Sequence, residues 1–225
     1  MLWGASHEAA LRGEKTSASG SPWPLPGDRA RERELKRDAV LAAAARLFNR
    51  EGFHATSLDD VARVLGVTKP TIYHYFSNKD EILFECTRRG LEAVSIAAAR
   101  AAGAGGNGLE RLRSLMTEYA AVMTQDFGRC ITLTSETDLS ETSKAEFRRI
   151  KREVDQMVRA VVAAGMQDGS IAPADARLVT FTVTGALNGI ARWFDDSGPL
   201  SVDEVARACV DILVRGVAPR APSAR

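Results

Sequence analysis

The sequence predicts an all-α protein, in which an N-terminal three-helix domain with a helix-turn-helix precedes a larger helical domain. From Arg29 onward, Ala, Leu, Arg and Glu recur with helical periodicity, and no alternating β-branched pattern occurs. Proline is absent from the interiors of the long patterns, and the run GAGGNG at 103–108 divides the two parts. With 45% hydrophobic residues in a chain of 225, there is enough apolar material for a core.

Charge and cysteine content exclude several classes of protein. Thirty basic and 29 acidic residues give a net charge of +1, and residues 29–90 hold the excess, since 12 basic less 9 acidic side chains leave +3. This weakly indicates a nucleic-acid partner. The three cysteines are far apart and form no CxxC pair, so we expect neither a zinc site nor a disulfide framework. No other metal site and no cofactor is expected.

Membrane and enzyme signals are missing as well. The longest uncharged run has 14 residues, whereas a membrane span needs about 20. Charges occur near the N-terminus where a signal peptide would be apolar, so we expect a cytoplasmic protein without a membrane partner. No GxSxG, HExxH or P-loop motif is present and only three histidines occur, so we do not expect an enzyme.

The first elements along the chain are an arm and a long helix. Residues 1–28 collect Gly, Ser and Pro without periodicity and are expected to form a mobile arm. A helix is predicted over about 31–50 because its apolar residues recur on one face. Gly52 ends this helix as a C-terminal cap.

Two short helices around a glycine turn follow. Ser57 stands at an N-cap position, Asp60 three residues later completes a capping box, and Gly66 ends the helix. Thr68 is expected to cap the next helix, KPTIYHYF, with Pro70 tolerated in its first turn. A tight glycine turn sets two such helices near a right angle, so the pattern predicts a helix-turn-helix whose second helix is free to enter a major groove.

The free face of this second helix carries donors suited to phosphates and base edges, while its other aromatic residues are expected in the core. Ser57 and Lys79 stand at helix N-termini on either side, where phosphates can bind. A helical hairpin with a closed aromatic core is the alternative. The predicted DNA-binding residues are Ser57, Thr68, Lys69, Pro70, Thr71, Tyr73, His74 and Lys79.

A fourth helix opens at Lys79, and the helices after the glycine run are predicted to be longer. Their apolar residues recur with helical spacing over about 109–127, 141–167, 175–194 and 201–216. Ser201 is expected to cap the last of them.

The stretch AARLFNREGFHATSLDDVARVLGVTKPTIYHYFSNKDEIL, within about residues 33–89, resembles the DNA-binding half of TetR-like bacterial regulators. Pro70 replaces a frequent glycine, which is a known variant. The resemblance implies a helix-turn-helix over 57–76 and a second helical domain that binds a small molecule and dimerises through its last two long helices. We therefore expect a DNA-binding domain at 29–90, an effector-binding and dimerisation domain at 91–218 and a C-terminal tail at 219–225.

The segment ALNGIARWFDDSGPLSVDEVARACVDILVRGV resembles branches of this family that sense acyl-CoA esters or other lipid-like ligands. Methionine and aromatic side chains at helical spacing can line an adaptable apolar pocket, although a closed core gives the same pattern. The predicted pocket residues are Met116, Tyr119, Met123, Phe127, Phe147, Met157, Phe181, Asn188, Arg192 and Trp193. The predicted dimer interface includes Val205, Cys209 and Ile212.

Together these observations favour a ligand-responsive transcriptional regulator. We expect a homodimeric repressor that a small, mainly apolar effector, such as an acyl-CoA or a related acid, releases from a quasi-palindromic operator in double-stranded DNA. The alternative is a helical small-molecule-binding or interaction protein that no longer binds DNA. Repression and activation are not distinguished by the sequence.

Overall fold

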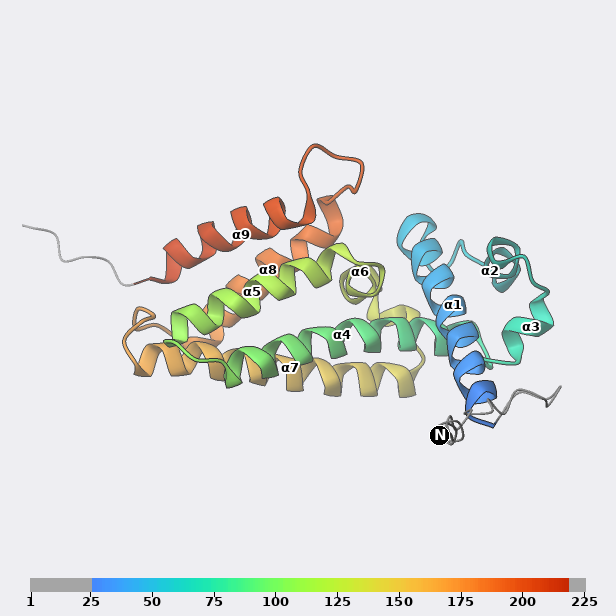
Figure 1. Ribbon diagram of the computed structural model, residues 1–225, viewed down its shortest axis with the longest axis horizontal. Helices are drawn as coiled ribbons and strands as arrows, with labels where there is room; N and C mark the ends of the chain where they lie inside the picture. The colour runs from blue at the N-terminus through green and yellow to red at the C-terminus, as the bar shows by residue number, and fades with distance from the viewer. Residues whose placement is uncertain (1–25, 219–225) are drawn as a thin grey trace, which may run out of the picture. The chain divides into compact units, whose positions relative to one another are not determined.

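The computed structural model describes residues 26–218 (Figure 1), and every regular element in that range is helical, which confirms the predicted fold class. The elements are α1 (Pro26–Glu51), α2 (Leu58–Leu65), α3 (Lys69–Tyr73), α4 (Lys79–Gly103), α5 (Gly108–Thr124), α6 (Asp126–Leu133), the 3-10 turn η1 (Glu136–Asp138), α7 (Glu141–Gln167), α8 (Ala176–Trp193) and α9 (Val202–Val217). A boundary between two compact units falls inside α1, and the unit that begins at Arg37 holds the core.

The larger part of this unit is organised around α4 and α5. α4 packs against α5, α6 and α7, and α5 packs in turn against α8 and α9. Figure 1 shows α4, α5 and α7 running side by side, with α8 and α9 on the other side of α5. Gly90 of α4 permits a close approach, because a Cβ there would lie 2.3 Å from the carbonyl oxygen of Phe127 on α6.

The capping signals in the sequence are confirmed at several helices. Ser57 and Asp60 form a capping box at α2, and Ser201 caps α9 through Glu204. Hydrogen bonds from Ser57 lower the pKa of Asp60 to about 2, so the cap is ionised at neutral pH. α7 has the predicted bounds.

Three boundaries differ from the predictions. α1 begins at Pro26, so residues 26–28 are helical and not part of an arm, while 1–25 and 219–225 lie outside the described residues. α3 ends at Tyr73, and the remainder of KPTIYHYF continues as a turn. The predicted helix over 109–127 is broken by the extended conformation of Gln125, after which α6 begins.

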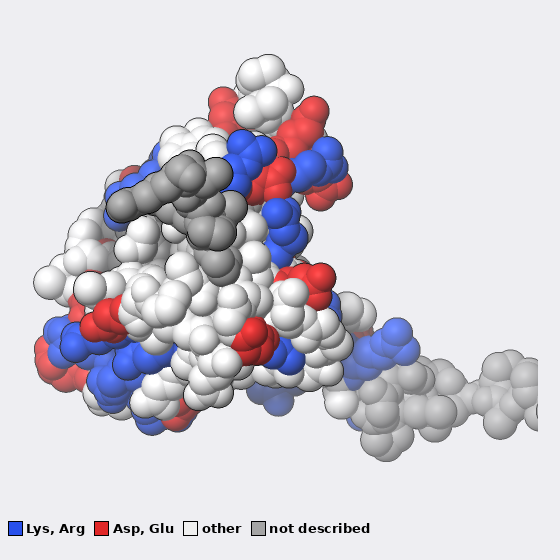
Figure 2. Space-filling view, turned by 90° about the vertical axis from the view of Figure 1, so that its left-hand side faces the viewer, with Lys and Arg blue, Asp and Glu red and all other residues white. Residues whose placement is uncertain are grey.

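In the described part of the chain, no helix is both long and apolar enough to cross a membrane. Figure 2 shows one face of the molecule, on which basic and acidic side chains are interspersed around a broad uncharged area. This face therefore gives no indication of a surface for a polyanion.

A charged cluster connects α1 to α4. Glu85 is only 7% exposed. Its carboxylate accepts two hydrogen bonds of 2.7 Å from Arg88, and Arg37 and Arg89 each lie 3.5 Å from it. Burial alone would raise the pKa of Glu85, but the three guanidinium groups outweigh burial and lower it. Glu85 is therefore ionised at neutral pH and holds these three cations together.

We expect Glu85→Gln to lower the free energy of unfolding by about 1–3 kcal/mol at neutral pH, because three cations lose their shared anion. Since the pKa is lowered in the folded state, the contribution is present above the ordinary value of 4.5 and is lost as pH falls through the lowered folded pKa. Urea unfolding at a series of pH values, from neutral to below 4.5, measures this contribution. The control Glu92→Gln removes an exposed carboxylate that pairs with Arg88 and should change stability by about 0.5 kcal/mol or less. Equal losses in both variants would contradict the prediction.

Candidate nucleic-acid interface and effector cavity

A glycine turn joins α2 to α3. Gly66 has a φ of +66°, and its N–H donates to the carbonyls of Ala62 and Arg63. Side chains other than glycine rarely adopt this conformation, so Gly66 makes the turn possible. Ile72 and Phe76 are buried and anchor the segment, which confirms the prediction for Phe76. The opposite face of α3 is left in solvent.

Most of the predicted DNA-binding residues share this solvent face. Tyr73 is 49% exposed, although it is a large aromatic residue. Thr68 occupies the N-cap position, but its hydroxyl lies 3.0 Å from the hydroxyl of Thr71 and does not cap the backbone, so the expected side-chain cap is wrong. The exposed members of the set on α3 and its flanking turns are Thr68, Pro70, Thr71, Tyr73 and His74.

Lys69 also lies at this surface, where it is paired with Asp59 of α2. Its Nζ donates to the Asp59 carboxylate over 2.7 Å, and this hydrogen bond raises the pKa of Lys69. Both side chains are about half exposed. A phosphate of DNA can therefore replace the carboxylate without a buried charge being left behind.

Ser57 and Lys79 differ from this group because both are engaged within the protein. Ser57 is exposed but caps α2. Lys79 Nζ donates to the carbonyls of Phe53 (2.7 Å) and Thr56 (2.9 Å) and lies 4.1 Å from the centre of the Phe53 ring. Burial lowers the pKa of Lys79. These contacts favour a structural role for Lys79 over the predicted phosphate contact.

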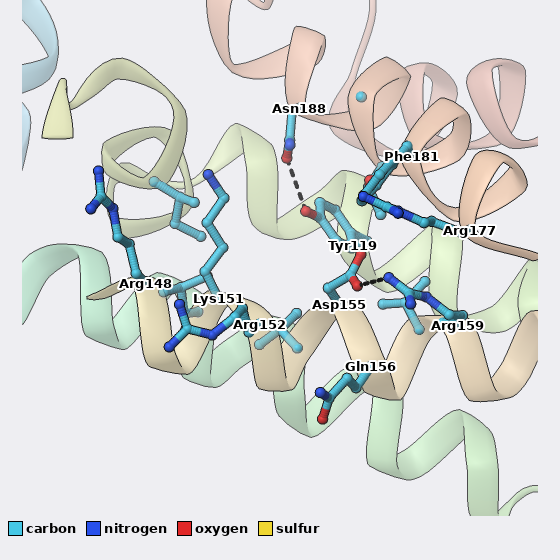
Figure 3. A pocket seen from close by; sticks show the side chains of 16 residues that line it. Tyr119, Arg148, Lys151, Arg152, Asp155, Gln156, Arg159, Arg177, Phe181 and Asn188 are labelled. Atoms are coloured by element: carbon cyan, nitrogen blue, oxygen red, sulfur yellow. Dashed lines mark hydrogen bonds and ion pairs between the residues drawn. The ribbon is translucent and has the colours of Figure 1, made fainter. Parts of the chain in front are cut away.

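A cavity of about 690 Å³ lies in the helical domain, lined by residues of α4, α5, α6, α7 and α8 (Figure 3). One part of its wall is apolar, made of Leu91, Ile131, Val154, Val158 and Phe181. The cationic part consists of Arg148, Lys151, Arg152, Arg159 and Arg177, against a single carboxylate, Asp155. The cavity is thus both apolar and strongly cationic.

The cations of this wall are incompletely neutralised. Arg159 binds Asp155, yet its buried Nε–H has no acceptor among the described residues. Arg148 pairs with Glu136 outside the lining. Lys151 and Arg152 have no carboxylate partner in residues 26–218, and Lys151 extends from α7 on the side where Tyr119 and Asn188 lie (Figure 3). An anionic ligand group would therefore meet cations that are not already paired.

The uncharged polar part of the cavity is fixed by a bond between α5 and α8. The hydroxyl of Tyr119 donates to Asn188 Oδ1 over 2.9 Å (Figure 3). Burial raises the pKa of Tyr119 to about 12, so this phenol is neutral and cannot act as an anion toward the ligand.

Three of the ten predicted pocket residues, Tyr119, Phe181 and Asn188, line the cavity, and seven do not. Several of these seven lie instead in the closed core, which was the alternative explanation of the methionine and aromatic spacing, because they are on the buried face of their helices. Arg192 points elsewhere and donates to the carbonyl of Thr132 over 3.2 Å. The residues outside the lining are Met116, Met123 and Phe147 (buried), Phe127 and Met157 (partly buried), and Arg192 and Trp193 (exposed).

The cationic residues of α7 were missed because regular charge along a helix usually marks a solvated face. That interpretation fits Arg149, which binds Glu146 and Glu153. The available signal was local density: residues 148–152, RRIKR, hold four cations in five positions, more than the neighbouring acids can pair.

The predicted interface residues on α9 fall into different environments. Ile212 is 70% exposed and Cys209 is partly buried, whereas Val205 is 2% exposed in the single chain. Val205 therefore packs inside its own subunit, and its place in the predicted interface is wrong. A sequence stripe cannot separate these two kinds of burial.

Two family profiles match the chain. The first, described as bacterial regulatory proteins of the tetR family, matches residues 40–86, which include α2 and α3. The second, described as a tetracyclin repressor-like C-terminal domain, matches residues 105–217, just over half of the chain. The chain belongs to the TetR family. It is a transcriptional regulator with a helix-turn-helix and not an enzyme, as expected from the sequence.

Individual relatives agree with this membership. The transcriptional repressor KstR2 of Mycolicibacterium smegmatis is 27% identical over 192 residues, covering 81% of this chain and 90% of its own. The TetR-family regulator PfmR from Thermus thermophilus has a TM-score of 0.72 at 31% identity, covering 78% and 97% of the two chains. AibR, solved with isovaleryl coenzyme A and operator DNA, has a TM-score of 0.71 at 25% identity, covering 80% and 98%.

We expect Tyr73→Ala to weaken operator binding by about 1–3 kcal/mol, because the exposed ring and hydroxyl are free to meet the groove. Tyr73→Phe is the matched control, since it keeps the ring and removes only the hydroxyl. Fluorescence anisotropy at fixed salt measures the affinities, and thermal unfolding should be unchanged because Tyr73 is half exposed. Lys69→Ala is expected to weaken binding by a similar amount. Wild-type affinity in both alanine variants would show that α3 does not read DNA as assigned.

Proposed function

We propose that this regulator is a homodimeric repressor that binds a quasi-palindromic operator in the cytoplasm. An effector with an apolar part and an anionic part, such as an acyl-CoA or a related acid, would release it from DNA. The observation that carries the effector class is the cavity wall, where unneutralised cations of α7 adjoin an apolar surface. The operator half of the proposal is supported by the exposed face of α3.

The chemistry of the cavity narrows the ligand. Five cations against one carboxylate favour a group with more than one negative charge, such as a phosphate or diphosphate. The apolar wall gains about 25 cal/mol for each Å² of ligand surface removed from water, which suits an acyl or aromatic chain. A free fatty acid supplies a single charge and is the weaker match. The structure of AibR with isovaleryl coenzyme A supports the same class of ligand.

The proposed dimer uses the outer faces of α8 and α9. Leu178 and Trp193 on α8 and Ile212 on α9 are more than half exposed, which is unusual for large apolar side chains outside an interface. In such a dimer two copies of α3 would meet successive major grooves about 34–36 Å apart.

We expect Lys151→Ala to weaken binding of the responsive acyl-CoA about tenfold, because one unpaired cation of the wall is removed. The matched control is Arg149→Ala on the same helix, whose guanidinium is already bound to Glu146 and Glu153 outside the cavity lining. The measurement is release of labelled operator across a series of acyl-CoAs, free fatty acids and aromatic acids. Equal effector affinity in the two variants would remove α7 from the ligand site, and a response to polycations alone would refute the proposed class.

Ile212→Glu is expected to weaken dimerisation by about 2 kcal/mol or more, because it would place a charge in an apolar interface. Arg207→Glu, also exposed on α9 but on a different side of the helix, is the control and should remain dimeric. Sedimentation velocity over a range of concentrations reports the state. Val205→Glu should instead unfold the chain, because Val205 is buried within the subunit. An unchanged dimer for Ile212→Glu would contradict the assigned interface.

A further inference from the structure

The first two side chains of α4 point to different parts of the molecule. Lys79 holds the carbonyls of Phe53 and Thr56, at the corner of the chain just before α2. Asp80, the next residue, reaches the start of α7. The first turn of α4 is therefore bound both to the loop that leads into the helix-turn-helix and to the helix that carries the cavity cations.

The contact made by Asp80 is dense. Its carboxylate accepts hydrogen bonds from the backbone N–H of Ser140 (2.6 Å), from the Ser140 hydroxyl (2.9 Å) and from the Ser143 hydroxyl (2.7 Å). Ser140 is the N-cap residue of α7. The first N–H groups of a helix have no partner in the helix itself and carry partial positive charge, so a carboxylate from another helix stabilises this end of α7.

A second bridge runs parallel to the first. His54 Nε2 lies 2.9 Å from the carboxylate of Asp138, in the 3-10 turn that precedes α7. The corner at 53–56 is thus connected to the segment 138–143 directly, through His54, and indirectly, through Lys79 and Asp80. We call the contact of Asp80 with Ser140 and Ser143 the Asp80 joint.

The helix that Asp80 contacts, α7, also lines the cavity. Arg148, Lys151 and Arg152 line the cavity and lie only two to three turns after Ser140 on the same helix. A rigid helix that shifts when an anion binds its side chains also shifts its own first turn. The three hydrogen bonds of Asp80 must then break or move the first turn of α4 with them.

We propose that the Asp80 joint couples α7 to the helix-turn-helix, so that Asp80 is a positioning residue for operator binding. Part of the inference rests on the proposed function, namely that α7 holds the anionic group of the effector. The coupling between α7 and DNA does not. By thermodynamic reciprocity, a joint that passes a signal from the cavity to the operator also passes one from the operator to α7.

The experiment therefore uses DNA as the probe and needs no effector. Amide hydrogen exchange of residues 141–150 is measured in the full-length protein, with and without a duplex selected from a random library for binding to it. In the wild type, DNA should slow this exchange about fivefold or more. Asp80→Asn, which keeps the size of the side chain and removes its charge, should reduce the slowing to about twofold or less at matched DNA saturation.

Two further variants make the result specific. Ser143→Ala removes one donor from the α7 side and leaves α4 and the helix-turn-helix unaltered, so it decides the matter if Asp80→Asn fails to bind DNA. Glu81→Gln is the matched control, because Glu81 lies in the same turn of α4 but has no hydrogen bond to α7 in the described part of the chain. Its carboxylate accepts a hydrogen bond of 2.7 Å from the N–H of Ser77. It should keep the wild-type response.

The inference is overturned if the wild type shows no DNA-dependent change in 141–150, or if Ser143→Ala retains the full wild-type change. The acyl-CoA series is run on the wild type as a separate arm. If no acyl-CoA releases the operator, the proposed effector is refuted. The hydrogen-exchange result still decides whether α7 is coupled to the helix-turn-helix.

Discussion

The packing of α4 is the constraint on which the described chain depends. This one helix begins next to the recognition segment and then contacts α5, α6 and α7, so it belongs to both functional parts. Its buried side chains, among them Ile82, Leu83, Leu91 and Val94, extend over most of its length. A helix packed in this way moves as one body, because dense interiors have discrete arrangements and do not deform continuously.

Around α4, apolar contacts supply most of the stability, and polar contacts fix the orientation of the neighbouring helices. Asn49 of α1 donates to the carbonyl of Asp126 at the start of α6 over 2.9 Å. The charged cluster at Glu85 adds a link between α1 and α4. Polar contacts of this kind are directional, so a small displacement breaks them and a small free energy can switch them. They suit a regulator better than further apolar burial would.

How far the sequence predicts the fold depends on whether the signal is local. The capping box of Ser57 and Asp60 and the bounds of α7 follow from neighbouring residues, and the structure confirms them. The break at Gln125 does not, because apolar periodicity continues across it and α6 is placed by distant partners such as Asn49. The same holds for Lys79, whose acceptors lie 23 and 26 residues earlier.

The exposed face of α3 and the cavity differ in the same way in how far the sequence predicts them. Tyr73 and Thr71 are exposed because Ile72 between them is buried, which the short helix pattern already implies. The cavity brings together side chains from five helices, so its residues could not be selected from any single stripe. Met116 and Met123 have the spacing expected for a pocket but lie in the core. Apolar spacing indicates that a side chain is buried, and it does not show whether other side chains or a ligand pack against it.

The neighbouring positions of Lys79 and Asp80 have a consequence for protein engineering. Successive residues of a helix project about 100° apart, so one residue inserted directly after Asp80 would turn both side chains away from their partners while the rest of α4 stays packed. In a hybrid regulator, in which the DNA-reading head of one protein is fused to the sensor of another, a junction between Phe76 and Lys79 keeps Asp80, Ser140 and Ser143 in one parent. Lys79 then requires only backbone carbonyls from the other parent, whereas a junction further along α4 would set Asp80 of one protein against the α7 of another.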